Sequence, residues 1–212
     1  MLTLPTHETT LPASGKPIEI TPLLVRDEKS IAAAKRAGSK ADSYRTFLNI
    51  LQEKINTDIT KLAEVDLIHC MLKLRKISIG SMVNVNFVCP YTQQRVDVNL
   101  NLADVELKGK HKEKTLKSDN FIVKLGLPLK VKNIESGIIS IQTEEETIVM
   151  SEILPKEKNE LIDSLPIKLR NEITEKLQDI INYTHDVEYE TNQKHSIPLR
   201  SAEDFFTLFF VM

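Results

Sequence analysis

The spacing of apolar residues predicts a helical zone in the first part of the chain. Apolar residues recur at three- and four-residue intervals after Asp42 and again from Leu62 to Lys76, which is the period of amphipathic helices. These two stripes contain Tyr44, Phe47, Leu48, Leu51, Ile55, Val65, Ile68, Met71 and Leu72. A segment rich in helix-forming residues from Arg26 to a stop near Gly38 predicts one more helix.

The residues before this zone predict extended structure. Residues 1–15 are rich in Thr and Pro and are expected to form an extended N-terminal arm. Residues 16–23 alternate apolar and polar positions, as strands do. Pro17 and Pro22 cannot donate to a sheet ladder, so this strand is expected at a sheet edge. Residues 16–82 are therefore interpreted as an edge strand followed by the helical zone.

After residue 82 the hydrophobic period changes from that of helices to that of strands. Alternating apolar positions come before and after a turn, which predicts a hairpin that contains Cys89. These positions are Val83, Val85, Phe87, Cys89, Val96, Val98, Leu100 and Leu102. Residues 121–125 predict another strand, so residues 83–150 are interpreted as a β-rich region.

Residues 151–212 combine three features. A helical zone to about Asn182 is broken by Pro155 and Pro166, a second hairpin begins near Val187, and a Phe-rich segment makes up the C-terminal end. Together with the preceding regions, this order predicts an α+β fold of helices and β-hairpins.

Composition and motif searches argue against several classes of function. The net charge is -2 and the sequence pI is about 6.2, whereas nucleic-acid-binding proteins need a basic surface. No apolar run reaches the roughly 18 residues of a membrane span, and the first residues lack the features of a signal peptide. The six glycines are not clustered and the five histidines are scattered. We therefore expect no enzyme activity, cofactor, metal or membrane, and two free thiols at Cys70 and Cys89.

The two predicted hairpins resemble zinc knuckles that have lost their ligands. Each has an aromatic residue two positions before the turn, where a zinc ribbon would carry Cys-x-x-Cys. The four corresponding positions are Cys89, Thr92, Thr191 and Lys194. Only one thiol remains, and Lys194 would repel a cation, so we expect metal-free knuckles. Two unrelated hairpins are the alternative.

The C-terminal segment concentrates four of the seven phenylalanines in eight residues. They are Phe205, Phe206, Phe209 and Phe210. Burying each side chain contributes about 1.5–3 kcal/mol, so the segment is expected to dock on apolar surface. That surface belongs either to the chain's own core or to a partner protein. In the second case the four phenylalanines are the partner-binding residues.

The order of these features resembles the baseplate hub assembly proteins of T-even-like contractile-tailed bacteriophages. The resemblance covers nearly the whole chain and is most specific from Leu11 to Lys29, with Asp204-Phe205-Phe206 second. It implies that other tail and baseplate hub proteins are the partners. It also implies a place in the host cytoplasm during assembly or in the virion tail baseplate. Members of this family often carry Cys-x-x-Cys at the two hairpins, and zinc binding is not carried over to this chain.

The expected function is therefore non-enzymatic viral tail assembly, as a baseplate hub component or its chaperone. The chain would cover apolar surfaces of its partners until the hub closes, and self-association is a further possibility. Two alternatives stay open. The basic run from Lys108 to Lys117 would serve a nucleic-acid-binding module, and the knuckle-like hairpins would serve a zinc-ribbon-like structural domain.

Overall fold

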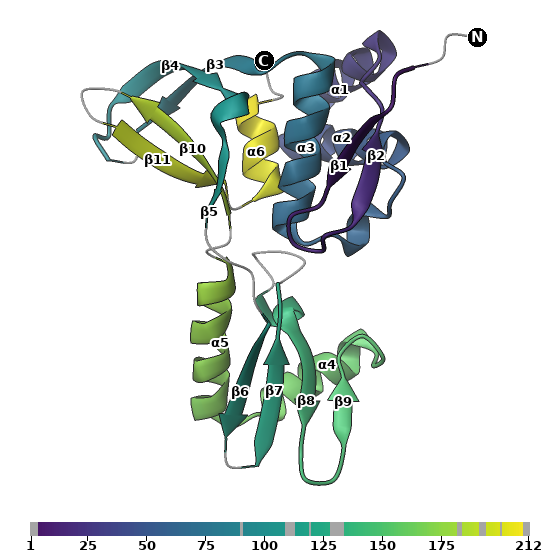
Figure 1. Cartoon of the computed structure of the whole chain (residues 1–212), viewed down its shortest axis with the longest axis vertical. Coiled ribbons are helices and arrows are strands. Elements are labelled where there is room, and N and C mark those ends of the chain that lie inside the picture. The colour runs from purple at the N-terminus through teal and green to yellow at the C-terminus, as the bar shows by residue number, and fades with distance from the viewer. Residues whose placement is uncertain are drawn as a thin grey trace. The chain divides into compact units, whose positions relative to one another are not determined.

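The computed structural model describes most of the chain, as two compact units. The described residues are 4–89, 91–108, 113–118, 120–127, 134–181, 184–190, 194–199 and 201–209. Unit 1 comprises Met1–Leu107 and His185–Met212, and unit 2 comprises Lys108–Thr184 (Figure 1). Helices and small antiparallel sheets occur in both, which confirms the α+β class. The division at residues 15, 82 and 150 stays a prediction, and the structure joins the first and last segments of the chain in one unit.

The N-terminal part of unit 1 is a hairpin rather than a single extended segment. β1 (His7–Thr10) pairs antiparallel with β2 (Pro17–Ile20). β1 lies within the segment expected as an arm, and β2 coincides with the strand expected from residues 16–23. Leu11 follows β1 and is 0% exposed, so this segment belongs to the core of unit 1.

Three helices follow, the first where helix-forming residues predict it and the other two where apolar periodicity does. They are α1 (Val25–Ala37), α2 (Lys40–Lys54) and α3 (Glu64–Ser78), with a short 3-10 helix at Ile59–Lys61. Ser39 precedes α2 and its hydroxyl accepts a hydrogen bond from the amide of Asp42, which satisfies one free donor at the helix start. The first helix ends at Ala37, directly before Gly38, as the sequence predicts.

The rest of unit 1 consists of two hairpins and a C-terminal helix. β3 (Met82–Val88) pairs with β4 (Arg95–Asn101), and β10 (Thr184–Glu190) pairs with β11 (Lys194–Leu199). A 3-10 helix (Leu102–Asp104) leads into β5 (Glu106–Lys108), which is the third strand of the β11-β10-β5 sheet. α6 (Ala202–Phe209) packs against α3.

Unit 2 is a four-stranded antiparallel sheet with helices. Its strand order is β6-β7-β8-β9, and the elements are β6 (Lys114–Ser118), β7 (Phe121–Leu125), η3 (Ile134–Gly137), β8 (Ile138–Gln142), β9 (Thr147–Val149), α4 (Pro155–Ser164) and α5 (Ile167–Ile181). Pro155 is the first residue of α4, and Pro166 directly precedes α5 and separates the two helices. The apolar sides of the sheet and of α5 form a separate core, with Leu116, Val123, Ile141, Leu169, Ile173 and Leu177.

An ion pair between α1 and α2 is buried in unit 1. Lys54 Nζ lies 2.7 Å from Asp27 Oδ2, and the two side chains are 6% and 7% exposed. The same carboxylate oxygen accepts a hydrogen bond from the amide of Leu24 at 2.8 Å, which caps α1. Burial alone would raise the pKa of Asp27, but the hydrogen bonds from Lys54 and Leu24 and the charge of Lys54 lower it below its usual value.

Removing Lys54 tests this pair. Lys54→Met leaves a buried carboxylate without its cation and is expected to lower the free energy of unfolding of unit 1 by about 3–5 kcal/mol. Adding Asp27→Asn to that variant removes the charge and should restore part of the loss. Urea denaturation measures both effects, with Lys61→Met as the control because Lys61 is 82% exposed. A loss no larger than that of the control would contradict a stabilising role for the pair.

Candidate protein-contact surfaces

The structure places the first half of the Phe-rich segment in the chain's own core. Phe205 is 0% and Phe206 is 1% exposed. The ring centroid of Phe206 lies 4.9 Å from that of Phe47 and 5.5 Å from that of Tyr44, both on α2. The side chain of Phe209 and the whole of Phe210 lie outside the described residues. A partner-binding role for the four phenylalanines therefore stays a prediction, and Phe205 and Phe206 act as core residues in this chain.

The two knuckle-like hairpins pack together through their tips. Cys89 Sγ and the Tyr189 hydroxyl form a hydrogen bond of 2.9 Å. The Tyr91 hydroxyl donates to the backbone oxygen of Ser196 at 2.8 Å, and the rings of Tyr91 and His195 stack with centroids 4.8 Å apart. Tyr189 is the aromatic residue before the second turn, and the sequence did not predict that the two hairpins pack together.

Cys89 has an unusual electrostatic environment. Burial would raise the pKa of its thiol, but hydrogen bonds from Thr92, from Tyr189 and from the amides of Thr92 and Tyr91 lower the pKa to about 7. The residue is 0% exposed, so its sulfur is out of reach of an external substrate unless the hairpins part. Its visible role is to hold the two hairpin tips together.

Of the other knuckle positions, Thr92 hydrogen-bonds the Cys89 thiol. Lys194 forms an ion pair with Glu188 on the neighbouring strand, and Thr191 lies outside the described residues. Cys70 is free and buried in α3, and burial, together with the charge of Asp66, raises the pKa of its thiol to about 12. Within the described ranges, no group of three or more His, Cys, Asp or Glu side chains is arranged to hold a metal ion.

Two histidines stack where α3 meets β10. The ring centroids of His69 and His185 lie 5.5 Å apart, and His69 Nε2 lies 3.0 Å from the hydroxyl oxygen of Thr9. Burial lowers the pKa of both imidazoles to about 4, with nearby positive charge as the second cause. His185 Nε2 is buried and has no hydrogen-bond partner among the described residues. This pair is therefore neutral in the folded protein near pH 7.

A groove of about 500 Å³ in unit 1 runs beside β4, and we call it the β4 groove. Its lining is Asp97, Val98, Asn99, Asn101, Asp104, Val105, Val187, Glu188, Tyr189 and Lys194. Cys89 N donates to Gln94 O and Leu102 N donates to Ser81 O, at the two ends of the β3–β4 pair. Between these ends, every second residue of β4 is hydrogen-bonded to β3. Asp97, Asn99 and Asn101 lie between those residues, so their N–H and C=O groups are directed away from β3. The β4 groove thus exposes a strand edge with acidic residues beside it.

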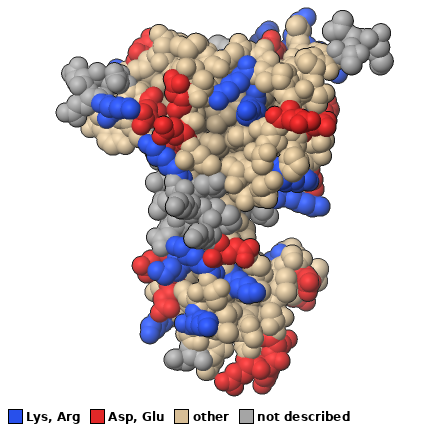
Figure 2. All heavy atoms as spheres, viewed as in Figure 1, with Lys and Arg blue, Asp and Glu red and all other residues tan. Residues whose placement is uncertain are grey.

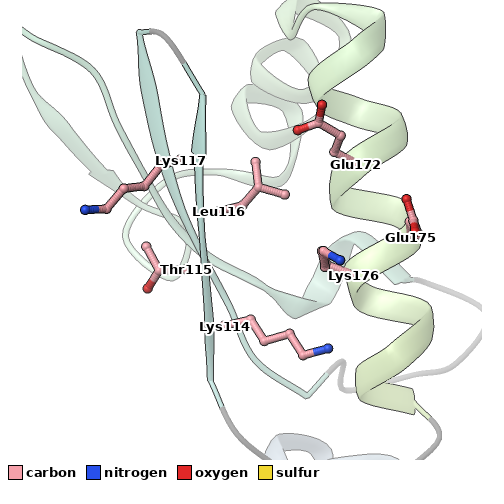
Figure 3. Close-up of a pocket in the computed structure, with 7 residues that line it drawn as sticks. All are labelled: Lys114, Thr115, Leu116, Lys117, Glu172, Glu175 and Lys176. Atoms are coloured by element: carbon pink, nitrogen blue, oxygen red, sulfur yellow. The ribbon is translucent and has the colours of Figure 1, made fainter.

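A second groove, of about 640 Å³, lies in unit 2 between β6 and α5 (Figure 3). We call it the β6 groove, and its lining is Lys114, Thr115, Leu116, Lys117, Glu172, Glu175 and Lys176. Leu116 and Lys114 lie on the α5 side of the strand, and Lys117 points away from the helix (Figure 3). Strand residues of both faces line the groove, so it runs along the edge of β6.

Charged residues of both signs occur on the face shown in Figure 2, in both units. Of the basic run from Lys108 to Lys117, Lys114 and Lys117 lie on β6, whereas residues 110–112 are outside the described part. None of the helices in the described ranges has the length and apolar character of a bilayer span.

The Cys89 environment can be tested by titration. The thiolate absorbance of the folded protein is expected to rise around pH 7, and Cys89→Ser should remove this step. Tyr189→Phe deletes one hydrogen bond to the sulfur and should raise the pKa of Cys89 by about one unit. Cys70→Ser is the matched control and should leave the step unchanged. A step that survives Cys89→Ser would assign it to another group.

The histidine pair predicts acid sensitivity. A pKa lowered from 6.5 to about 4 in the folded state means that the unfolded chain binds protons first as pH falls. Above about pH 6.5 both histidines are neutral in the folded and in the unfolded chain, and the free energy of unfolding does not depend on them. As pH falls from 6.5 toward 4, only the unfolded chain takes up protons at His69 and His185, so the free energy of unfolding decreases. His185→Phe should reduce the fall of the Tm over this window, whereas His7→Gln at an exposed position should not. Equal slopes in both variants would contradict this assignment.

A comparison with protein families gives a match over nearly the whole chain. The family is described as T4 bacteriophage base plate protein, and its model matches residues 4–207, which include both units. Comparisons with curated proteins and with solved structures give no match. The match and the resemblance found in the sequence both indicate a baseplate protein, and the match does not specify a hub or chaperone role. The chain belongs to the T4 bacteriophage base plate protein family.

Proposed function

We propose that this baseplate protein is a component of the baseplate hub, or a chaperone of its assembly, and that it acts by binding other tail proteins without catalysis. The observation that carries the proposal is the family match over residues 4–207, because it includes both compact units. Subunits of a multiprotein assembly need surfaces that fit neighbouring subunits. The hub role rests on the resemblance of Leu11–Lys29 and of the C-terminal segment.

The described surface supports a role in protein contact. Both grooves run along strand edges. An open strand edge is a surface to which other proteins can add an extended segment through backbone hydrogen bonds. Cys89 is the thiol with the lowered pKa, and it is enclosed between two hairpins. We place the chain in the host cytoplasm during assembly, where it would meet unassembled hub proteins.

Deleting the gene from an infecting phage tests this role. Without the chain, hub intermediates should fail to mature and the yield of complete baseplates should fall at least tenfold. Expression of the wild-type chain in the host restores the yield, and a chain with a Lys61→Met substitution should restore it equally. Normal yields of hubs of normal composition without the chain would contradict the proposal.

Quantitative mass spectrometry of purified particles then separates the two roles. A hub component is present in mature virions in a fixed ratio to other hub proteins. A chaperone is cross-linked to hub proteins in assembly intermediates and is absent from virions. Cross-links only to proteins outside the hub would contradict both.

A further inference from the structure

The ladder of unit 2 shows which backbone groups β6 leaves open. Thr143 N donates to Glu146 O and Met150 N donates to Ile139 O, so Ile141 directs its backbone groups toward β9. Ser140 and Gln142 then direct theirs toward β7, where their partners are Lys124 and Ile122.

The same alternation continues through β7 to β6. Val123 directs its backbone groups toward Leu116, and therefore Thr115 and Lys117 direct theirs away from the sheet. No other described strand pairs with this edge. β6 therefore offers two amides and two carbonyl oxygens to a further strand.

α5 lies on the β6 side of the sheet, and the β6 groove is the space beside the strand (Figures 1 and 3). A strand added at this edge would enter the groove and extend the sheet beneath the helix. The groove is lined by Glu172, Glu175 and Lys176 on the helix. Glu175 and Lys176 are exposed, and neither glutamate is in an ion pair among the described residues.

We propose that the β6 groove binds the β6 groove of a second copy of this chain, so that two β6 strands pair antiparallel about a twofold axis. The charges on the groove are the reason for choosing a second copy. Glu172 lies toward the Lys117 end of the groove, and Lys176 and Lys114 lie toward the other end (Figure 3). A twofold axis brings the acidic end of one groove to the basic end of the other.

The order of residues in β6 also favours one register for the pairing of the two β6 strands. With Leu116 on the axis, Thr115 pairs with Lys117 of the second copy, and both outward-directed pairs form hydrogen bonds. Lys114 then lies opposite Ser118, so no lysine faces a lysine across the strands. A register with Lys117 opposite itself would place like charges together, which is unfavourable. The proposal does not depend on the hub role.

Proline substitution tests the edge without breaking the native ladder. Thr115→Pro removes an outward amide that β7 does not use, so unit 2 should keep its fold. Thr147→Pro is the matched control, because Thr147 is an exposed threonine with an outward amide on the opposite edge strand, β9. Analytical ultracentrifugation of wild-type chain should show a concentration-dependent dimer of twice 24.1 kDa.

The expected result is that Thr147→Pro associates as the wild type does and Thr115→Pro stays monomeric. Far-UV circular dichroism spectra of the two folded variants should coincide, which separates loss of the edge from loss of the fold. A wild-type chain that is monomeric at every concentration would overturn the proposal. So would a Thr115→Pro variant that is folded and dimeric.

Charge reversal tests whether the β6 groove binds the β6 groove of a second copy. Glu172→Lys alone and Lys176→Glu alone place like charges across the axis, and each should weaken self-association at least about tenfold in Kd. An equimolar mixture of the two variants restores both opposite-charge pairs and should dimerise with nearly the wild-type Kd. If the mixture associates no better than each variant alone, the paired grooves are not the interface.

Discussion

Unit 1 depends on contacts that α3 makes with both ends of the chain. The carboxylate of Asp66 accepts a hydrogen bond from the amide of Ala13 at 2.7 Å, and that of Glu64 accepts one from the amide of Ala202 at 2.5 Å. The second bond also places a negative charge at the start of α6. Because unit 2 occupies residues 108–184 between the two segments, the bond from Ala202 to Glu64 closes a long loop. α3 is therefore the element on which the two segments of unit 1 meet.

This arrangement explains the position of the contact surfaces. α3 and α6 bury Phe205 and Phe206, so the most apolar segment of the chain stabilises the unit. The second hairpin directly precedes α6, and Tyr189 reaches Cys89 at the tip of the first hairpin. In the described part of the chain, two strand edges lie beside grooves, the β4 groove in unit 1 and the β6 groove in unit 2.

Local patterns in the sequence were enough to predict α1, α2, α3 and the two knuckle-like hairpins, but not β1 or β6. Tyr44, Phe47 and Leu51 share one side of a helix, and Val83 and Val85 alternate along a strand, so each periodicity is visible within a few residues. Neither the stacking of Phe206 on Phe47 nor the joining of residues 1–107 with residues 185–212 has a local signal. The same holds for the β6 groove, because Lys114 and Glu172 come together only when α5 packs on the sheet. The resemblance indicated the baseplate, and the comparison confirmed it at that level.

Hydrogen exchange measured on the free chain and on the chain within purified hub intermediates tests the central claim, that this baseplate protein works through contact at its strand edges. The account predicts that the outward amides of Asp97, Asn99 and Asn101 exchange more slowly in the intermediates, while the amides of α3 keep the rates of the free chain. Unchanged exchange at β4 and at β6 in an intermediate that contains the chain would contradict the account.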